Sequence, residues 1–312
     1  MGNPQVVVNL PLNEDVMFSN HKGVYKKGLE KRQRKMLAKA EFLEHFLRDG
    51  EEILLISQAC SPTSLIEQLT TGAIVYYLKR ALLVVTNQRI LHVPTKMNLS
   101  YRNSISQILY GDCTQLVMKR GQLFAKYRDG SKENFLAVKE KKKFKVILPD
   151  LLKGGMQSNA GRRTHLCPRC TTELEAGVFS CSACQLEFKS KKQGIKYSIL
   201  IPGGGYFYTR HPILGLGDAA VEVFLIGLVL VALFATGGEV AAGESSIEDT
   251  MVMLGIFGGA LAYEKMLSIY HANHFIKEFI PKEKNFAMEF RPTGNTLEPT
   301  STPEIHRPIP IG

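Results

Sequence analysis

The sequence lacks the residue patterns that mark most enzyme active sites. No nucleophile stands near a base and an orienting acid at a catalytic spacing, and the glycines at 203–205 are not followed by the GK[ST] of a phosphate loop. His92 falls in a strand-like run, which favours a packed or surface histidine over a catalytic base. We therefore expect a protein that binds or assembles, and no enzyme.

The sequence also has few features of an exported or lipidated chain. The first residues have neither a basic region nor a long apolar run, so no signal peptide is expected. Val6 stands where a myristoylation motif needs Ser or Thr. Of the six cysteines, only Cys60 and Cys113 lie outside one motif, and both are predicted to be ordinary reduced thiols.

What the sequence does contain is an apolar run long enough to cross a membrane. Residues 219–236 are apolar apart from Glu222 and a terminal threonine, and a helix of this length reaches about 27 Å. A second apolar run spans the bilayer if its helix covers about 249–270. The segment between them has acids but no Lys or Arg, whereas basic residues flank the pair. This pattern predicts a hairpin in the cell (inner) membrane with both termini cytoplasmic; two buried helices of a soluble domain are the alternative.

Two features of the hairpin point to contacts within it. In an antiparallel pair, Glu222 and Lys265 fall at similar depth, so we predict that they form an intramembrane pair; the alternative is that each side chain reaches the headgroups by itself. Gly255 and Gly259 form a GxxxG, which favours close helix packing against the first helix near Gly227 or against another subunit. A homo-oligomer is therefore left open.

The net charge of +10 lies mostly on the segments predicted to be cytoplasmic. A helix is predicted from Val24 to Gly50, and its first half is strongly basic. One interpretation places it on anionic headgroups, together with a second lysine cluster; the other packs its apolar stripe on the next domain and leaves the charges in water. The candidate lipid-binding or membrane-surface residues are Lys26, Lys27, Lys31, Arg32, Arg34, Lys35, Lys141, Lys142 and Lys143.

Residues 51–153 alternate short strand-like runs with turns and end in a predicted helix that Pro149 breaks. The expected strands are 52–59, 72–77, 81–86, 89–93, 104–110, 115–119, 123–127 and 134–137. Many short strands followed by one helix predict a small curled sheet or barrel capped by that helix.

The succession GEEIL, LLVVTNQRILHV and SISQILYG, then a strand pair and a helix, resembles bacterial pleckstrin-homology-like (PH-like, GRAM-like) domains. The most specific part of the resemblance is TNQRI, at residues 86–90. The resemblance implies a β-barrel with a closing helix that binds or assembles and does not catalyse. It leaves a lipid headgroup, a protein partner and no ligand all open. The insertion at 61–72 departs from the shorter form of the family.

Two CxxC motifs form the sharpest signal in the chain. Four thiolates at this spacing surround one Zn²⁺ tetrahedrally, so we predict a structural zinc ribbon with Zn²⁺ as its cofactor; the ligands are Cys167, Cys170, Cys181 and Cys184. Phe179 and Phe188 are available for its small core. Too few aromatic residues accompany the nearby arginines for single-strand stacking, so nucleic acid is not an expected partner.

These predictions combine into a multi-domain α+β membrane protein. The predicted units are an N-terminal extension (1–50), a PH-like domain (51–153), a flexible linker (154–164), a zinc ribbon (165–190), an interfacial segment with two transmembrane helices (195–280) and a disordered Pro-rich tail (281–312). The expected function is a non-enzymatic adaptor or scaffold that holds a protein partner or anionic lipid at the membrane. The alternative is a hairpin subunit of a transport or secretion assembly.

Overall fold

The computed structural model describes residues 10–64, 67–69, 72, 75–242, 247–283, 285–286 and 288. The helices are α1 (Glu14–Phe18), α2 (Lys27–Leu37), η1 (Glu41–Phe46), α4 (Val75–Leu78), η3 (Tyr110–Asp112), α5 (Lys141–Leu151), η4 (Leu152–Gly154), α6 (Lys191–Leu200), α7 (Gly204–Tyr208), α8 (Pro212–Ala242) and α9 (Ile247–Ile276). The strands are β1 (Ile53–Cys60), β2 (Arg80–Thr86), β3 (Arg89–Pro94), β4 (Ile105–Leu109), β5 (Cys113–Lys119), β6 (Gln122–Tyr127), β7 (Lys132–Phe135), β8 (Thr164–Leu166) and β9 (Glu173–Leu174).

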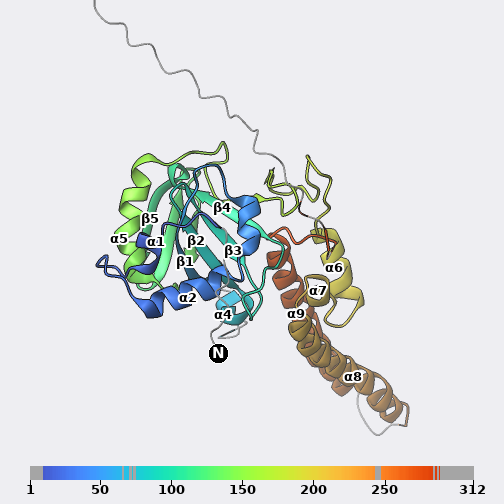
Figure 1. Ribbon diagram of the computed structural model, residues 1–312. Helices are drawn as coiled ribbons and strands as arrows, with labels where there is room; N and C mark the ends of the chain where they lie inside the picture. Colours follow the sequence, from blue (N-terminus) through green and yellow to red (C-terminus); the bar gives the residue numbers. More distant parts are fainter. Residues whose placement is uncertain are drawn as a thin grey trace, which may run out of the picture.

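The strands form two open antiparallel sheets, ordered β1-β2-β3-β4-β8-β9 and β5-β6-β7 (Figure 1). The mixed α+β architecture is as expected, but the closed barrel is wrong. The outer edge of β4 pairs with β8, where Ser106 lies opposite His165, and therefore does not continue into β5. On the other side, a single bridge between Cys60 and Leu136 joins the two sheets. We call the described residues of 10–190 the sheet body.

The first sheet is buried on both faces along β1, β2 and β3. One apolar core lies between the two sheets and is closed by α5 through Phe144 and Leu148. A second core covers the opposite face, where α1, α2 and η1 contribute residues such as Met17, Leu37 and Phe46. Strands covered on both sides carry continuous apolar runs, as in ALLVV of β2, while β6 shows the alternating burial of a one-sided strand.

The single helix predicted from Val24 to Gly50 is two short helices in the structure, α2 and η1, and α1 precedes them in the N-terminal extension. The chain turns at residues 38–40, between α2 and η1, although this stretch has good helix formers. The turn lets Met36 and Leu43 pack on the same sheet, and a straight helix would carry its second half away from it. Gln33 anchors α2 by bonding both the N–H and the C=O of Ile56 in β1. The apolar side of α2 thus faces the sheet, and its lysines face outward.

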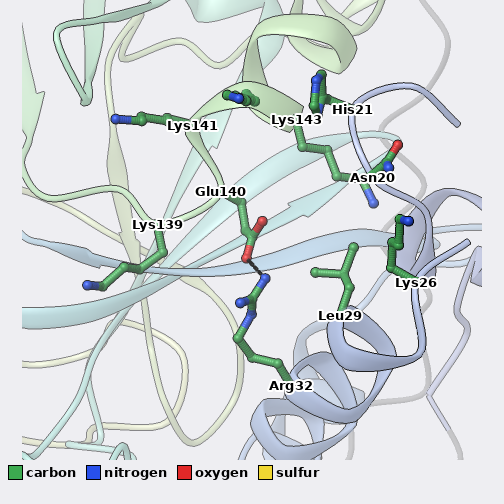
Figure 2. A pocket seen from close by; sticks show the side chains of 10 residues that line it. Asn20, His21, Lys26, Leu29, Arg32, Lys139, Glu140, Lys141 and Lys143 are labelled. Atoms are coloured by element: carbon green, nitrogen blue, oxygen red, sulfur yellow. Dashed lines mark hydrogen bonds and ion pairs between the residues drawn. The ribbon is translucent and has the colours of Figure 1, made fainter. Parts of the chain in front are cut away.

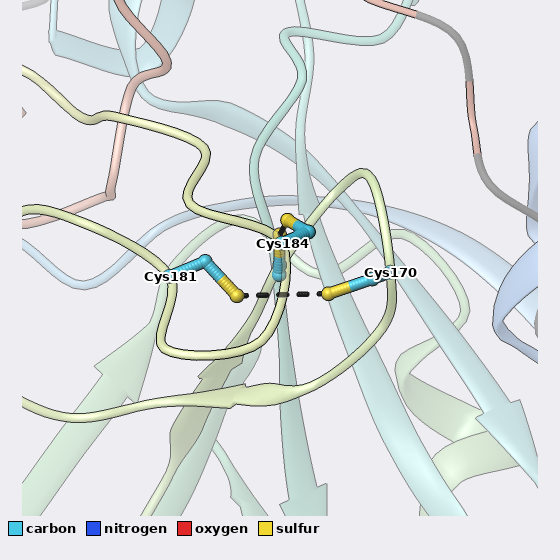
Figure 3. Close-up of side chains that lie close together, drawn as sticks. Cys170, Cys181 and Cys184 are labelled. Carbon is cyan, nitrogen blue, oxygen red and sulfur yellow. Dashed lines mark hydrogen bonds between the residues drawn. The ribbon is translucent and has the colours of Figure 1, made fainter.

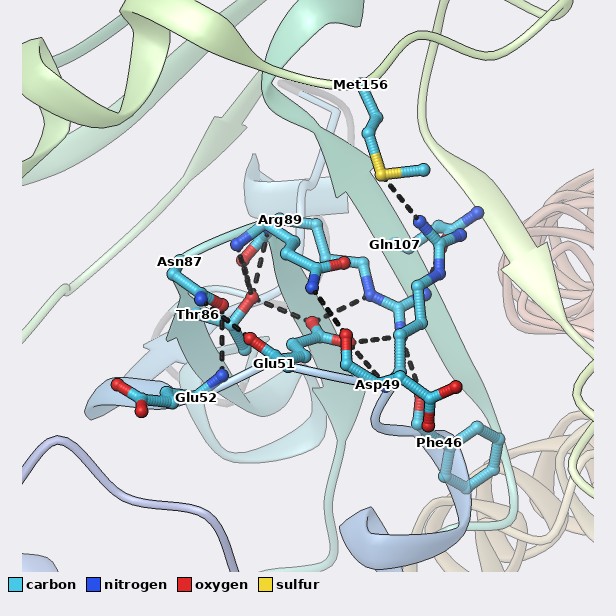
Figure 4. A network of polar contacts seen from close by, with 12 residues as sticks. Phe46, Asp49, Glu51, Glu52, Thr86, Asn87, Arg89, Gln107 and Met156 are labelled. Atoms are coloured by element: carbon cyan, nitrogen blue, oxygen red, sulfur yellow. Dashed lines mark hydrogen bonds and ion pairs between the residues drawn. The ribbon is translucent and has the colours of Figure 1, made fainter. Parts of the chain in front are cut away.

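Residues of the TNQRI segment hold the chain that precedes β1 through hydrogen bonds (Figure 4). Arg89 is 2% exposed and donates to both carboxylate oxygens of Glu51, at 2.9 and 2.8 Å. It also donates to the side chain of Gln107 and, at 2.5 Å, to the carbonyl of Phe46. Thr86 donates to Glu51 as well, at 2.7 Å. The glutamate of GEEIL and the arginine of TNQRI therefore act as one buried, hydrogen-bonded pair.

Three local predictions differ from the structure. The strand expected at 72–77 is wrong where the chain is described, because residues 75–78 form α4. The helix predicted to break at Pro149 continues to Leu151 with the proline inside its last turn. The segment 154–164 is held against the sheet: Ser158 bonds Asp112, and a Cβ at Gly155 would lie 2.4 Å from that of Tyr110. Composition suggested a flexible linker there, but these contacts fix it.

Helices α8 and α9 form an antiparallel hairpin that projects from the sheet body (Figure 1). Both are long and apolar enough to cross a membrane, over Pro212–Phe234 and Thr250–Ile276. Only 11% and 6% of the most apolar stretch of each span is buried inside the structure. A helix of a soluble core would be covered, so the apolar surface favours a lipid environment. The predicted loop around 243–246 and the tail from residue 289 onward lie outside the described residues.

Candidate metal centre and the contacts around it

Four cysteine thiols converge on one point (Figure 3). All four sulfurs lie within 4.8 Å of one another. The Sγ atoms of Cys167 and Cys184 are 3.5 Å apart, and those of Cys170 and Cys181 are 3.6 Å apart. A tetrahedral zinc with bonds of about 2.3 Å requires sulfurs separated by about 3.8 Å. The four cysteines are therefore placed to hold a metal ion such as zinc.

The two CxxC turns have the same backbone geometry. The N–H of Cys167 donates to Thr172 O, and that of Cys181 donates to Leu186 O. The residue after each second cysteine, Thr171 or Gln185, has a positive φ of 61° or 59°. Such conformations cost a residue with a side chain about 1–2 kcal/mol each, so the turns need an offsetting interaction. A metal ion shared by the four thiolates would provide one.

The two remaining cysteines lie apart from this cluster. Cys60 is buried in β1, and Cys113 is half-buried at the start of β5. Burial raises the pKa of Cys113 to about 12, which keeps this thiol protonated and unreactive near neutral pH.

Chain from beyond the hairpin completes the core of the cysteine unit. Phe188 is fully buried and packs edge-to-face on Phe279, with ring centroids 5.5 Å apart. Phe286 packs on the same cluster, whereas the predicted core residue Phe179 stays partly exposed. Phe188 also forms a β-bridge with Pro281. The residues after α9 therefore belong structurally to the cysteine unit, although they are distant in sequence.

A buried ion pair fixes this return segment to the sheet body. Glu278 accepts from His165 of β8 at 3.3 Å and lies 3.6 Å from Arg163. Burial alone would raise the pKa of Glu278, but Arg163 and His165 hold it well below its usual range. Arg163 also pairs with Glu133 of β7 at 2.8 Å. One arginine thus links both sheets to the end of the hairpin.

The insertion that departs from the PH-like pattern contacts α9. The hydroxyls of Ser64 and Tyr270 are 2.8 Å apart. Glu67 pairs with Lys79 at 3.1 Å, with both side chains nearly buried, and its other oxygen lies 3.5 Å from His274. His274 thus lies in this ion-pair cluster, and among the described residues it belongs to no group of side chains placed to hold a metal ion.

Glycines let α7 fit between its neighbours at the near end of the hairpin. Gly203 has φ +67°, and a Cβ on it would lie 2.1 Å from Gly215 O of α8. A Cβ on Gly204 would lie 2.1 Å from Tyr197 O of α6. The helix α6 beside it exposes apolar side chains, including Leu200 at 67%. This arrangement suits a segment at the headgroup level.

Glu222 and Lys265 contact one another inside the hairpin. Nζ of Lys265 lies 2.5 Å from Oε2 of Glu222, whose side chain is fully buried, and it also donates to Ser198 O at 2.7 Å. Two more acids, Glu264 and Asp218, have carboxylate oxygens within 4.8 Å of that of Glu222, and of these two only Asp218 was overlooked in the sequence. The sequence could have indicated this grouping, because each acid lies within one helical turn of Glu222 or Lys265 on its own helix.

Gly255 and Gly259 do not form the contact between α8 and α9. A Cβ built on either would meet nothing within 4 Å, and the same holds for Gly227 on α8. The glycine surface of α9 is thus open in the described chain.

The predicted basic residues divide into three groups. Arg34 pairs with Glu30 and Glu14 and lies over the Phe18 ring, and Lys143 is buried. The exposed residues Lys27, Lys31 and Lys35 lie on the outer side of α2. The remaining four line a cavity between α2 and α5: Lys26, Arg32, Lys141 and Lys142.

No protein-family model, no curated protein and no solved structure matches the chain. The PH-like resemblance therefore rests on this chain's own residues and strand order.

Proposed function

We propose that the chain is a non-enzymatic scaffold in the bacterial inner membrane, which presents a PH-like domain and a zinc ribbon to the cytoplasm for a protein partner or an anionic lipid. The observation that carries this proposal is the six-stranded sheet. Strands β1–β4 continue through β8 into the cysteine unit, and residues after α9 bond to that same unit. A sheet that continues into the cysteine unit, and is held by residues after α9, suits a rigid domain attached to the hairpin as its membrane anchor.

Zinc in this scaffold is structural. All four ligands are protein thiolates, so a tetrahedral ion has no open position for substrate or water. The surrounding core is small and draws Phe279 from outside the ribbon, which is typical of units that need metal to fold.

Strand order supports a PH-like domain. Four antiparallel strands, three further strands and a helix follow one another, and α5 closes the core between the sheets. The N-terminal extension covers the outer face of the first sheet, so binding to partners is expected at the remaining surfaces of the sheet body.

Two observations support the proposed membrane topology. Both ends of the hairpin return to the sheet body: Phe188, ahead of α6, bridges Pro281, beyond α9. Lys189, Lys191 and Lys192 precede the hairpin, and further lysines follow it, which favours the cytoplasmic side for these ends.

The scaffold is tested by purifying the full chain from native membranes in mild detergent and measuring metal and partners together. We expect one zinc per chain and a reproducible protein partner that is lost in Cys167→Ser/Cys181→Ser but kept in Cys113→Ser. Zinc with lipid but no protein would select the lipid form of the scaffold. A chain without zinc would contradict the ribbon.

A second candidate is a hairpin subunit of a membrane transport or secretion assembly. The open glycine surface of α9 favours it, because small residues allow another helix to approach closely. Gly255→Leu/Gly259→Leu would then dissociate an oligomer in gentle detergent, with Gly217→Leu as the control. A wild-type chain that is monomeric would contradict this function.

A further inference from the structure

A cavity of about 440 Å³ separates α2 from the start of α5 (Figure 2). Lys26 and Arg32 line it from the N-terminal extension, and Lys139, Lys141 and Lys142 line it from the other wall. None of the lining side chains is Phe, Tyr or Trp. Two basic segments that are distant in sequence thus meet around one space.

Most of the charge at this cavity is uncompensated. Among the described residues, Lys26, Lys139, Lys141 and Lys142 make no ion pair. Their positive charge is reinforced by the first turn of α5, an eleven-residue helix whose N-cap side chain makes no capping hydrogen bond.

Glu140 is the one acid that the described residues contribute to the cavity wall, and it pairs with Arg32 at 2.5 Å (Figure 2). The Arg32 side chain is 55% exposed, and a pair this accessible contributes little stability. A better anion can therefore replace the carboxylate at small cost.

The neighbouring loop is held in place independently of this pair. Lys143 turns away from the solvent and donates to the carbonyls of Val16, Met17 and Ser19, two of these at 3.0 and 2.7 Å. It fixes the loop that carries Asn20 and His21 on the cavity rim. The cavity wall is thus built, and its free lysines are available to a ligand.

We propose that this cavity binds a phosphate group, and that Glu140 occupies Arg32 until the phosphate replaces it. A phosphate carries two negative charges in a small volume, and a guanidinium binds it in bidentate fashion while ammonium groups surround it. A nucleic-acid strand fits less well, because the lining has no Phe, Tyr or Trp side chain for successive bases to stack on.

This inference names the chemical group that the proposed scaffold would bind in its anionic-lipid form. It rests on the proposed function only where a lipid is taken as the source of the phosphate. The group is either the headgroup of a lipid or a free phosphate compound. The cavity itself lies in the sheet body, so phosphate binding stands or fails without reference to the scaffold.

The test uses the full chain in mild detergent and measures binding of inorganic pyrophosphate and of dioctanoyl phosphatidic acid, with dioctanoyl phosphatidylcholine as the neutral lipid. We expect Arg32→Gln and the double variant Lys26→Gln/Lys142→Gln to weaken binding about tenfold. Glu140→Gln should strengthen it about threefold to tenfold, since Arg32 is then free. The matched controls are Lys96→Gln and Glu41→Gln, two exposed residues outside the cavity.

Each result decides one point. Binding of both probes with these variant effects supports a phosphate site, and binding of phosphatidic acid alone with the same effects identifies a lipid source. Binding that is unchanged in all cavity variants, or no preference for either phosphate probe over phosphatidylcholine, overturns the site. Phosphate binding by a full chain that carries no zinc would contradict the ribbon of the proposed scaffold and leave the phosphate site standing.

Discussion

The buried Arg89 network of the sheet body and the buried charges of the hairpin differ in how positive and negative groups are balanced. In the sheet body, Arg89 meets Glu51 within a network that also includes Thr86 and Gln107. In the hairpin, Lys265 lies beside a group of three acids, and among the described residues one buried oxygen each of Glu222 and Glu264 has no hydrogen-bond partner. Buried charges that are paired and hydrogen-bonded are typical of structural networks. The hairpin instead has three acids for one lysine, so its acidic and basic groups are not balanced.

The same contrast holds for apolar surface. The sheet body has two apolar cores, with α1, α2 and η1 over one face of the sheet. The hairpin leaves most of its apolar surface uncovered. The sheet body therefore buries its apolar side chains within the chain, whereas the hairpin exposes two helices that are long and apolar enough to cross a membrane.

The largest expected effect is the loss of metal from the cysteine cluster. Structural zinc contributes about 10–16 kcal/mol in small cysteine sites, so Cys181→Ser should release the metal and unfold residues 164–188. Hydrogen exchange measured by mass spectrometry should show lost protection there and intact protection in β1–β3, because those strands have their own cores. Cys113→Ser is the control and should keep its metal. Equal loss of protection in β1–β3 would show that the whole body depends on zinc.

Breaking the balanced network should have the next largest effect. Arg89→Met leaves Glu51 buried without its partner and should lower the free energy of unfolding by about 3–5 kcal/mol. Lys153→Met removes an exposed pair with Asp150 and should leave the free energy of unfolding nearly unchanged. Urea unfolding followed by circular dichroism compares the two. Similar effects for both variants would remove the distinction between a buried and an exposed pair.

The hairpin cluster should respond unequally to the loss of its base and of one acid. Lys265→Met leaves three acids together in the apolar helices and should cost about 2–3 kcal/mol. Glu264→Gln removes one of the excess charges and should leave the melting temperature in detergent unchanged or higher. A harmless Lys265→Met would mean that the ion pair has no structural role.

The smallest effect is a pH dependence within the sheet body. Burial, and secondarily Arg163, lower the pKa of His92 to about 3, and its ring nitrogens contact the hydroxyls of Ser61 and Ser106. The folded state therefore keeps the ring neutral, whereas the unfolded chain takes up a proton below about pH 6.5. Stability should fall by up to about 2 kcal/mol between pH 7 and pH 5.

His92→Gln tests this assignment, because it keeps hydrogen-bonding capacity and removes the titration. Denaturant unfolding at pH 7 and pH 5 should give a smaller difference in the variant than in the wild type. An equal difference would assign the pH dependence to other groups, such as the buried His211, whose pKa is also lowered by burial.

Sequence reasoning located features that depend on short spacings. The CxxC pairs and the apolar runs are local signals, and the similar depth of Glu222 and Lys265 follows from an antiparallel pair. Most strands of the sheet body were also predicted from residue type. The continuous apolar run of β2 was an unused signal that both faces of this sheet are covered.

What sequence reasoning missed depends on contacts between distant segments. Nothing local to Glu278 indicates that it meets Arg163, more than a hundred residues earlier. The break between α2 and η1 goes against helix propensity and follows from packing on the sheet. The barrel failed to close because the edge of β4 pairs with β8, a strand of the cysteine unit.

The bridge between Phe188 and Pro281 has a mechanical consequence. The chain ahead of α6 and the chain beyond α9 are joined like neighbouring strands, and α9 also contacts Ser64 of the sheet body, so the near end of the hairpin is held on that body. A tilt of the hairpin, as when bilayer thickness changes, would exert a torque on the cysteine unit at its near end. Because β8 of that unit is hydrogen-bonded to β4, the torque would reach the first sheet directly.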